Sequence, residues 1–229
     1  MRTLLERVDR VFSTYRPVSD VIRVRAGTPV EDVDPDVALV LQLAATAHRI
    51  TGGLFDVREG AELDPSGVVK GWATGAAFAD SGLGAFPGYL NAGGDLAVNG
   101  GPWRIGIEHP ADPTGLLTVL AVTGGAVATS GSAHRGSHLW DPRTGQPVMN
   151  PWQATVVGPE LVWADILATA AAVAGPETLD VTSWPADYEV LLCSSTGEVR
   201  TSRGFERWIA PDIGSLSSAE LGVGPESGS

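Results

Sequence analysis

The chain has few groups for covalent cross-linking and few for binding polyanions. Cys193 is the only cysteine among 229 residues, so an intrachain disulfide is excluded, and its apolar context, VLLC, predicts a buried thiol. Fifteen Lys and Arg stand against 27 Asp and Glu, a net charge of -12, and no run of basic residues occurs. This argues against a protein that follows nucleic-acid phosphates. An anionic ligand would need a local positive group or a metal ion.

Long apolar runs are also lacking. The longest apolar stretch, Leu161 to Ala174, contains Asp165 and is too short to span a bilayer. The N-terminal MRTLLERVDRVF is a charged amphipathic pattern without the apolar core or cleavage site of a signal peptide. We therefore expect a cytoplasmic protein with neither a membrane nor a nucleic acid as partner.

What is present indicates a globular, loop-rich protein. Hydrophobic residues make up 43% and charged residues 18%, and the 29 Gly and 16 Pro predict many tight turns. Apolar spacing of the helical type predicts helices, with Asp36 as N-cap or first-turn residue of the second and Gly175-Pro176 ending the fourth. The expected helices span residues 3–12, 36–50, 69–80 and 161–174.

Short apolar runs between these helices predict strands. Because many strands follow one another without an intervening helix, we expect an α+β fold: a largely antiparallel mixed sheet flanked by helices. One domain would cover residues 1–213, followed by a disordered Gly/Ser-rich tail over 214–229. The expected strands are 89–90, 96–98, 103–107, 117–122, 126–128, 139–140, 154–157 and a hairpin of 188–193 with 198–201.

The helix LVWADILATAAAVAG carries a candidate metal-binding pair. Asp165 and Thr169 are four residues apart and therefore share one helix face. A carboxylate and a hydroxyl at this spacing can hold Mg²⁺, which keeps waters and binds substrate phosphates. In the alternative, Thr169 bonds back to the carbonyl four residues earlier and Asp165 faces solvent. The Ala and Leu around Asp165 favour an inward carboxylate, which needs a partner.

Two glycine-containing motifs could approach a ligand. LDPSGVVKGWATG places Asp64, Gly67 and Lys70 where a turn enters a helix, so it is either an anion site at a helix N-terminus or a cap with a solvated lysine. Its spacing is not that of a Walker A loop. LNAGGDLAVNG predicts a hairpin or bulge at its two glycines, with Asp95 either structural or facing a ligand.

The segment TSGSAHRGSHLWDPRTGQP, residues 129–147, combines small residues with His134, His138 and two arginines. Histidine supplies a proton acceptor near neutral pH, and arginine supplies a planar donor fork for phosphate. The segment is therefore either a phosphate-binding loop beside a base or a surface loop ending in an Asp-Pro-x-x-Gly turn. In the second case Asp141 and Arg143 build that turn.

Taken together and in this order, these motifs resemble the ApbE family of FAD:protein FMN transferases. The motifs are FSTYRPVSDVIRV, TGGLFD, LDPSGVVKGWATG, LNAGGDLAVNG, ATSGSAHRGSHLWDPRTGQPV and ADILATAAAVAG, and the similarity covers about residues 4–210. It implies an enzyme that binds FAD with its pyrophosphate on Mg²⁺. A Thr or Ser hydroxyl of a target flavoprotein attacks the phosphorus on the FMN side, FMN becomes linked through a phosphoester, and AMP leaves.

The resemblance also assigns roles to individual residues. Asp165 and Thr169 would be metal ligands together with a backbone oxygen near Gly67, and His138 would be the general base or would orient the target hydroxyl, with His134 as the competing base. The positions that match FAD contacts are Tyr15, Gly53, Leu54, Phe55, Asp64, Lys70 and, through its backbone, Leu139.

The chain departs from the family pattern at several positions, most of them in its N-terminal half. The usual N-terminal strand with a Met-Gly-Thr-like motif is missing, the segment between TGGLFD and LDPSG is short, Gly75 stands where Asp is usual, and Ser137 replaces the first His of a common pair. Two alternatives follow: a non-catalytic protein that holds FAD, and a Mg²⁺-dependent FAD pyrophosphatase that releases FMN and AMP. The residues leave open whether the metal is Mg²⁺, Mn²⁺ or Ca²⁺.

Overall fold

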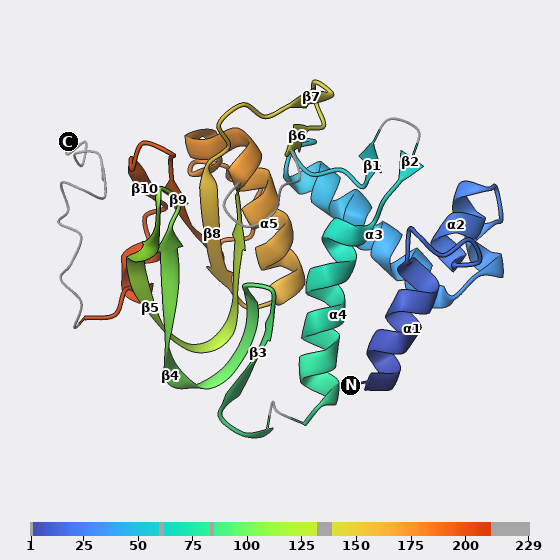
Figure 1. The fold of residues 1–229 in the computed structure, drawn as a ribbon, viewed down its shortest axis with the longest axis horizontal. Coiled ribbons are helices and arrows are strands. Elements are labelled where there is room, and N and C mark those ends of the chain that lie inside the picture. The colour runs from blue at the N-terminus through green and yellow to red at the C-terminus, as the bar shows by residue number, and fades with distance from the viewer. Residues whose placement is uncertain (1, 60–61, 83–84, 132–138, 212–229) are drawn as a thin grey trace.

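The fold has a sheet layer, a buried central helix and an outer helical layer (Figure 1). It is seen in a computed structural model, which describes residues 2–59, 62–82, 85–131 and 139–211. The tail expected over 214–229 lies outside these residues. Within the described ranges, no helix combines the length and the apolar character needed to cross a bilayer.

The main sheet has six strands in the order β10-β9-β8-β5-β4-β3. Every pairing between its neighbours is antiparallel, so the sheet is antiparallel throughout rather than mixed. Two small hairpins accompany it, β1 (Arg58–Glu59) with β2 (Glu62–Leu63) and β6 (Trp140–Asp141) with β7 (Gln146–Pro147). The strands of the main sheet are β3 (Gly88–Ala92), β4 (Asp95–His109), β5 (Asp112–Ser130), β8 (Gln153–Gly158), β9 (Glu189–Cys193) and β10 (Val199–Thr201).

Helix α5 (Leu161–Ala174) is the central element of the core, and ten of its residues are buried. Its Ala-rich face packs on the sheet, where small side chains let the helix approach closely. The opposite face, with Val162 and Ile166, joins a second apolar cluster with the outer helices. A helix that is apolar on all sides is stable only when covered on all sides, which explains its position.

The outer layer consists of α4 (Ser66–Asp80), which packs on α5, and of α1 (Arg2–Phe12), α2 (Asp20–Arg25) and α3 (Pro35–Ile50) beyond it (Figure 1). Phe12 meets the ring of Trp72 edge to face, 5.7 Å between centroids, which joins α1 to α4. Arg7 of α1 donates two hydrogen bonds to Asp34, which also accepts from the Asp36 amide at the start of α3. The pKa of Asp34 is lowered, chiefly by the bonds from Arg7.

The four expected helices are all present, with differences at their starts. The helix expected from residue 69 begins at Ser66, because the Asp64 carboxylate accepts from the Ser66 amide and fixes an earlier first turn. Asp34, not Asp36, is the N-cap of α3, and Asp36 lies in its first turn. Helix α2, capped by Ser19, was not expected, since six residues are too few for a periodic signal.

The expected short strands within residues 95–130 merge into two long ones. β4 and β5 form one hairpin whose register shifts between Asn99 and Trp103, so the glycine-rich interruption is an irregularity within a strand and not its end. Figure 1 shows this hairpin bending strongly on itself. The expected hairpin of 188–193 with 198–201 is confirmed, with β9 beginning at Glu189.

Candidate functional site

A buried charge cluster joins α4, α5 and the β3–β4 turn. The ammonium of Lys70 contacts the carboxylates of both Asp95 and Asp165, with Nζ 2.9 Å from Oδ1 of Asp165. The Asp95 and Asp165 side chains are only 1% and 3% exposed, whereas that of Lys70 is 24% exposed. The ammonium therefore closes the solvent side of a pair of buried carboxylates, which would be costly to bury unpaired.

The close approach of α4 to α5 brings Lys70 to Asp165. Gly71, the next residue along α4, faces Asp165, and a Cβ atom at Gly71 would lie 3.1 Å from the Asp165 Cβ. Only a residue without a side chain allows this separation. Lys70 therefore reaches Asp165 from a neighbouring helix.

Asp95 is positioned by a tight turn. Gly93 and Gly94 connect β3 to β4 with φ of 65° and 97°, the left-handed conformation that two-residue hairpin turns require. Asp95 begins β4 opposite Ala92, and its Oδ1 accepts a hydrogen bond of 3.3 Å from the Thr129 amide. The NAGGD motif thus forms the predicted hairpin, and its aspartate faces the cluster.

Two hydroxyl groups, one on α5 and one at the end of β5, extend the cluster. Thr169 lies one turn after Asp165 and donates a 3.1 Å hydrogen bond to the Asp165 carbonyl oxygen. Its Oγ1 is also 3.2 Å from Oγ of Ser130, at the end of β5. The back-bonding alternative for Thr169 is therefore present, but a hydroxyl that donates its proton keeps lone pairs for another partner.

These donors fit a small divalent cation. The cluster offers carboxylate and hydroxyl oxygens, the ligand class that Mg²⁺ and Ca²⁺ prefer. No set of three or more His, Cys, Asp and Glu side chains spaced for a metal occurs within the described parts of the chain. A cation here would therefore be held by few protein groups and would take further oxygens from water or substrate, as Mg²⁺ does.

Gly67 lies in the first turn of α4, four residues before Gly71 and on the same side of the helix. Its Cα faces Phe55, since a Cβ there would lie 3.2 Å from the Phe55 ring. Just before this turn, the Asp64 carboxylate accepts a hydrogen bond from the Ser66 amide. Gly67, Asp64 and Lys70 therefore all lie at the N-terminal end of α4, the end whose dipole favours an anion.

The other expected FAD contacts are not gathered to the same degree. Leu54 and Phe55 are 6% and 4% exposed and pack in the core, so their side chains are used by the fold. Gly53 has φ of 83°, and a Cβ there would lie 3.5 Å from Arg143 Cγ. Tyr15 is 93% exposed between α1 and α2. The structure thus places Tyr15 at the surface and does not bring it against the Lys70 cluster.

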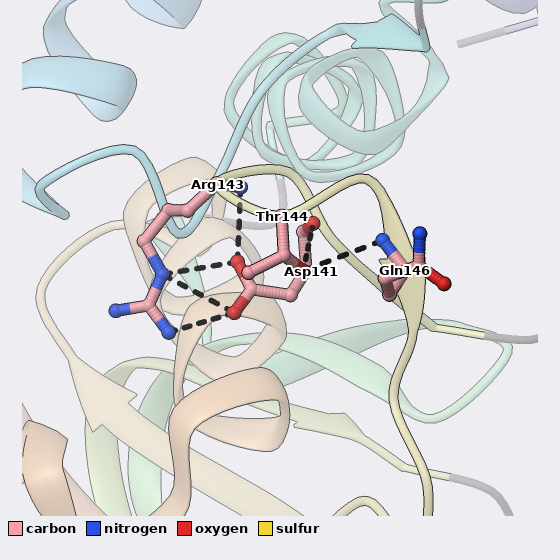
Figure 2. A network of polar contacts seen from close by, with 4 residues as sticks. All are labelled: Asp141, Arg143, Thr144 and Gln146. Carbon is pink, nitrogen blue, oxygen red and sulfur yellow. Dashed lines mark hydrogen bonds and ion pairs between the residues drawn. The ribbon is translucent and has the colours of Figure 1, made fainter.

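Within the segment 129–147, the described residues 139–147 form a turn. Figure 2 shows Arg143 folded onto Asp141: Nε and Nη2 donate to the carboxylate over 2.7–3.2 Å, and the Arg143 amide donates to Oδ1 at 2.9 Å. These bonds lower the pKa of Asp141 and make both residues part of the turn. Leu139 accepts from the Val148 amide at 2.7 Å, which closes the loop. His138 and His134 lie outside the described residues.

The sequence motifs predicted roles for Lys70, Asp165 and Thr169, and the structure brings these three residues together. The motifs left the role of Asp95 open and did not indicate Ser130. The available signal for Asp95 was its place directly after two glycines in an apolar alternation. For Ser130 it was the end of the apolar run before the histidine-containing segment. Neither signal states which other residue is contacted, because that depends on how the sheet meets α5.

The chain matches the family model described as "ApbE family" over residues 1–61 and 57–192. A relative from Rhodobacter capsulatus named FAD:protein FMN transferase is 32% identical over 70% of this chain and 33% of its own length. One of the same name from Escherichia coli strain K12 is 30% identical over 58% and 39%. The chain thus matches well under half the length of these curated relatives.

Solved structures share the fold. The flavin transferase ApbE from Vibrio cholerae superposes with a TM-score of 0.78 at 24% identity, over 90% of this chain and 88% of that one. The apo form of the Pseudomonas stutzeri flavinyl transferase ApbE gives 0.76 at 22% identity, over 93% and 87%. At this identity the likeness shows the fold alone.

Proposed function

Because the chain belongs to the ApbE family, we propose that it is a Mg²⁺-dependent FAD:protein FMN transferase. FAD would be the substrate, and a Thr or Ser hydroxyl of a target flavoprotein would be the acceptor, in a reaction that we expect in the cytoplasm. The observation that carries the proposal is the Lys70–Asp165–Thr169 cluster at the N-terminal end of α4. It places cationic and cation-binding groups together in a chain of net charge -12.

In the proposed reaction the acceptor oxygen forms a bond to the phosphorus on the FMN side of the FAD pyrophosphate. The bond from that phosphorus to the bridging oxygen breaks, and AMP leaves with the bridging oxygen. The acceptor proton passes to a base, for which His138 is the candidate and His134 the competitor. Transfer of this kind depends on positioning and on neutralising the phosphate oxygens.

The residues of the cluster would divide this work. Asp165 and Thr169, with a backbone oxygen near Gly67, would hold Mg²⁺, which when bound clamps phosphate oxygens and offsets their developing charge. Lys70, partly exposed at the rim, can pair with a phosphate oxygen. Asp64 would act at the turn that begins α4. The backbone of Gly53, Leu54 and Phe55 would support the flavin nucleotide beside Gly67, because the Leu54 and Phe55 side chains pack in the core. Tyr15 and Leu139 would complete the proposed FAD contacts.

The test uses the whole chain, FAD and Mg²⁺, with and without a target domain that carries an exposed Thr acceptor. The measurements are AMP release by chromatography and the intact mass of the target. We expect AMP only when target is present, together with a mass gain equal to FMN less water. A target in which the acceptor Thr is replaced by Val is the matched control and should gain no mass.

Other results would select the alternatives. AMP and FMN released without any target would indicate a pyrophosphatase, with water in place of the protein hydroxyl. Tight FAD binding with no AMP in either case would indicate a non-catalytic FAD-holding protein. Absence of FAD binding would overturn the proposal.

A further inference from the structure

Lys70 is held in a way that a simple phosphate contact does not require. Its ammonium contacts two carboxylates from different elements, Asp95 at the start of β4 and Asp165 in α5. Two carboxylates and one ammonium leave one formal negative charge on a cluster whose carboxylates are almost completely buried. Such a cluster favours the entry of additional positive charge.

Lys70 is also the only lysine in the chain, and the other members of the Lys and Arg set are all arginine. The two side chains differ physically: arginine presents a rigid planar fork that binds a carboxylate in two places, whereas lysine is a compact charge on a flexible stem. A flexible point charge can leave one carboxylate while keeping the other. The single lysine thus lies between two carboxylates, where its ammonium can move from one to the other.

We propose that Lys70 is a displaceable counter-ion for the metal ligand Asp165. In the metal-free protein the ammonium neutralises Asp165; when the divalent cation binds, the ammonium leaves Asp165 and is retained by Asp95. The inference rests on the proposed function, since it concerns the cation which that function uses. Asp95 is then a positioning residue that acts through Lys70.

Asp95 is suited to this role because it is fixed independently of Lys70. The Gly93-Gly94 turn and the pairing of Ala92 with Asp95 set its backbone, and the Thr129 amide holds its Oδ1. Its other oxygen, Oδ2, faces Lys70. Asn at this position can still accept from Thr129 while it loses the charge that retains the ammonium, which makes Asp95→Asn a conservative test.

The single lysine allows a direct observation. Protein labelled with carbon-13 at the lysine ε position carries one such side-chain signal, that of Lys70. Mg²⁺ is titrated into the whole chain alone and again with FAD present. We expect the Lys70 signal to move and to saturate with the same dissociation constant that calorimetry gives for Mg²⁺. A signal that stays in place while Mg²⁺ binds overturns the inference.

A double-mutant cycle on the Mg²⁺ dissociation constant tests the role of Asp95. Asp95→Asn should weaken Mg²⁺ binding by roughly tenfold, as for other groups that orient a metal site indirectly. Lys70→Met should tighten binding by roughly tenfold, because the competing charge is gone. In the Lys70→Met background, Asp95→Asn should have little further effect, since its route of action has been removed.

The cycle separates positioning from a general effect of charge. If Asp95→Asn weakens Mg²⁺ binding equally with and without Lys70, Asp95 acts through the field and the inference is wrong. Asp34→Asn, which removes the carboxylate paired with Arg7, is the matched control and should leave the dissociation constant unchanged. If Lys70→Met does not fold, the Lys70 signal is compared between the wild type and Asp95→Asn. Mg²⁺ should move this signal in the wild type and move it much less in Asp95→Asn, and equal movement in both would overturn the inference.

The outcomes also separate this inference from the proposed function. Failure of the wild-type chain to bind Mg²⁺ with or without FAD overturns the metal-dependent function and the inference with it. Mg²⁺ binding with an unmoved lysine signal, or with additive effects in the cycle, overturns only the inference.

Discussion

Gly71 of α4 lies directly against the backbone of Val162 in α5. A Cβ atom at Gly71 would come within 2.9 Å of the Val162 Cα and 3.0 Å of the Leu161 carbonyl oxygen, so the two helices touch where a side chain has no room. The contact lies beside the charge cluster, because Gly71 directly follows Lys70 and Val162 is three residues before Asp165. The separation of the helices therefore also sets the geometry of the charge cluster.

Replacing Gly71 with Ala should force α4 and α5 apart. We expect a loss of about 1–3 kcal/mol in the free energy of unfolding, the usual range for overpacking, measured by urea denaturation. The Mg²⁺ affinity should fall as well, because Lys70 and Asp165 would be moved. Gly75→Ala is the matched control: its Cβ would meet only Leu161 at 4.0 Å, so it should be neutral or stabilise by up to about 1 kcal/mol through helix propensity. Equal effects of the two substitutions would contradict this account.

Asp165 should be indispensable for metal-dependent transfer. Asp165→Asn keeps the shape but removes the charge, and we expect the rate of FMN transfer to fall at least about 100-fold, equivalent to about 2.7 kcal/mol of lost charge stabilisation. The measurement is target mass gain against time at several Mg²⁺ concentrations. Thr169→Val should raise the Mg²⁺ concentration needed for half-maximal transfer, because it removes the hydroxyl. Thr169→Ser, which keeps the hydroxyl, should leave that concentration unchanged. Unchanged turnover in Asp165→Asn would remove this residue from the proposed metal site.

Asp34 should stabilise the outer helices in a pH-dependent way. It caps α3 and accepts two hydrogen bonds from Arg7, so Asp34→Ala should lose about 1–2 kcal/mol of stability at neutral pH. Because its folded pKa is lowered by Arg7, this contribution is present above the ordinary carboxyl pKa of 3.8 and is lost as pH falls below it. Urea denaturation across the acid range should show a smaller decline for the variant. Parallel declines would contradict the assignment.

Tyr188 should make the fold sensitive to alkali. Burial raises the pKa of Tyr188 from 10.0 to about 12, so the folded chain keeps a proton that the unfolded chain releases. Stability should therefore be full below about pH 10 and decrease as pH rises toward 12. The checks are the ultraviolet absorbance change of phenolate formation and denaturation at each pH. Tyr188→Phe should remove this part of the alkaline decline while losing the bond from the Glu160 amide.

Local signals predicted the helices well and the strands less well. The α5 boundaries followed from an apolar run that ends at Gly175-Pro176, and the structure has the same bounds. β4 and β5 were expected as separate pieces because the apolar runs within residues 95–130 are short and interrupted. In the sheet these interruptions become register shifts, since pairing across the hairpin continues on both sides of them.

Local signals likewise predicted some features of the site and not others. Helical periodicity alone placed Asp165 and Thr169 on one face, and the surrounding Ala and Leu predicted that the carboxylate is buried; both are confirmed. Leu54 and Phe55 matched a motif, but their side chains pack in the core, because a motif does not state which of its atoms face a ligand.

The sequence by itself determined the α+β class, the four main helices, the family and the pair of oxygens on α5, because these depend on short-range periodicity and on motif order. Only the tertiary structure decided that Lys70 bridges Asp95 and Asp165 and that Ser130 reaches Thr169. Those contacts join residues far apart in the chain. They depend on how closely two helices approach at Gly71 and on where the β3–β4 turn meets them, which are properties of packing that no local pattern encodes.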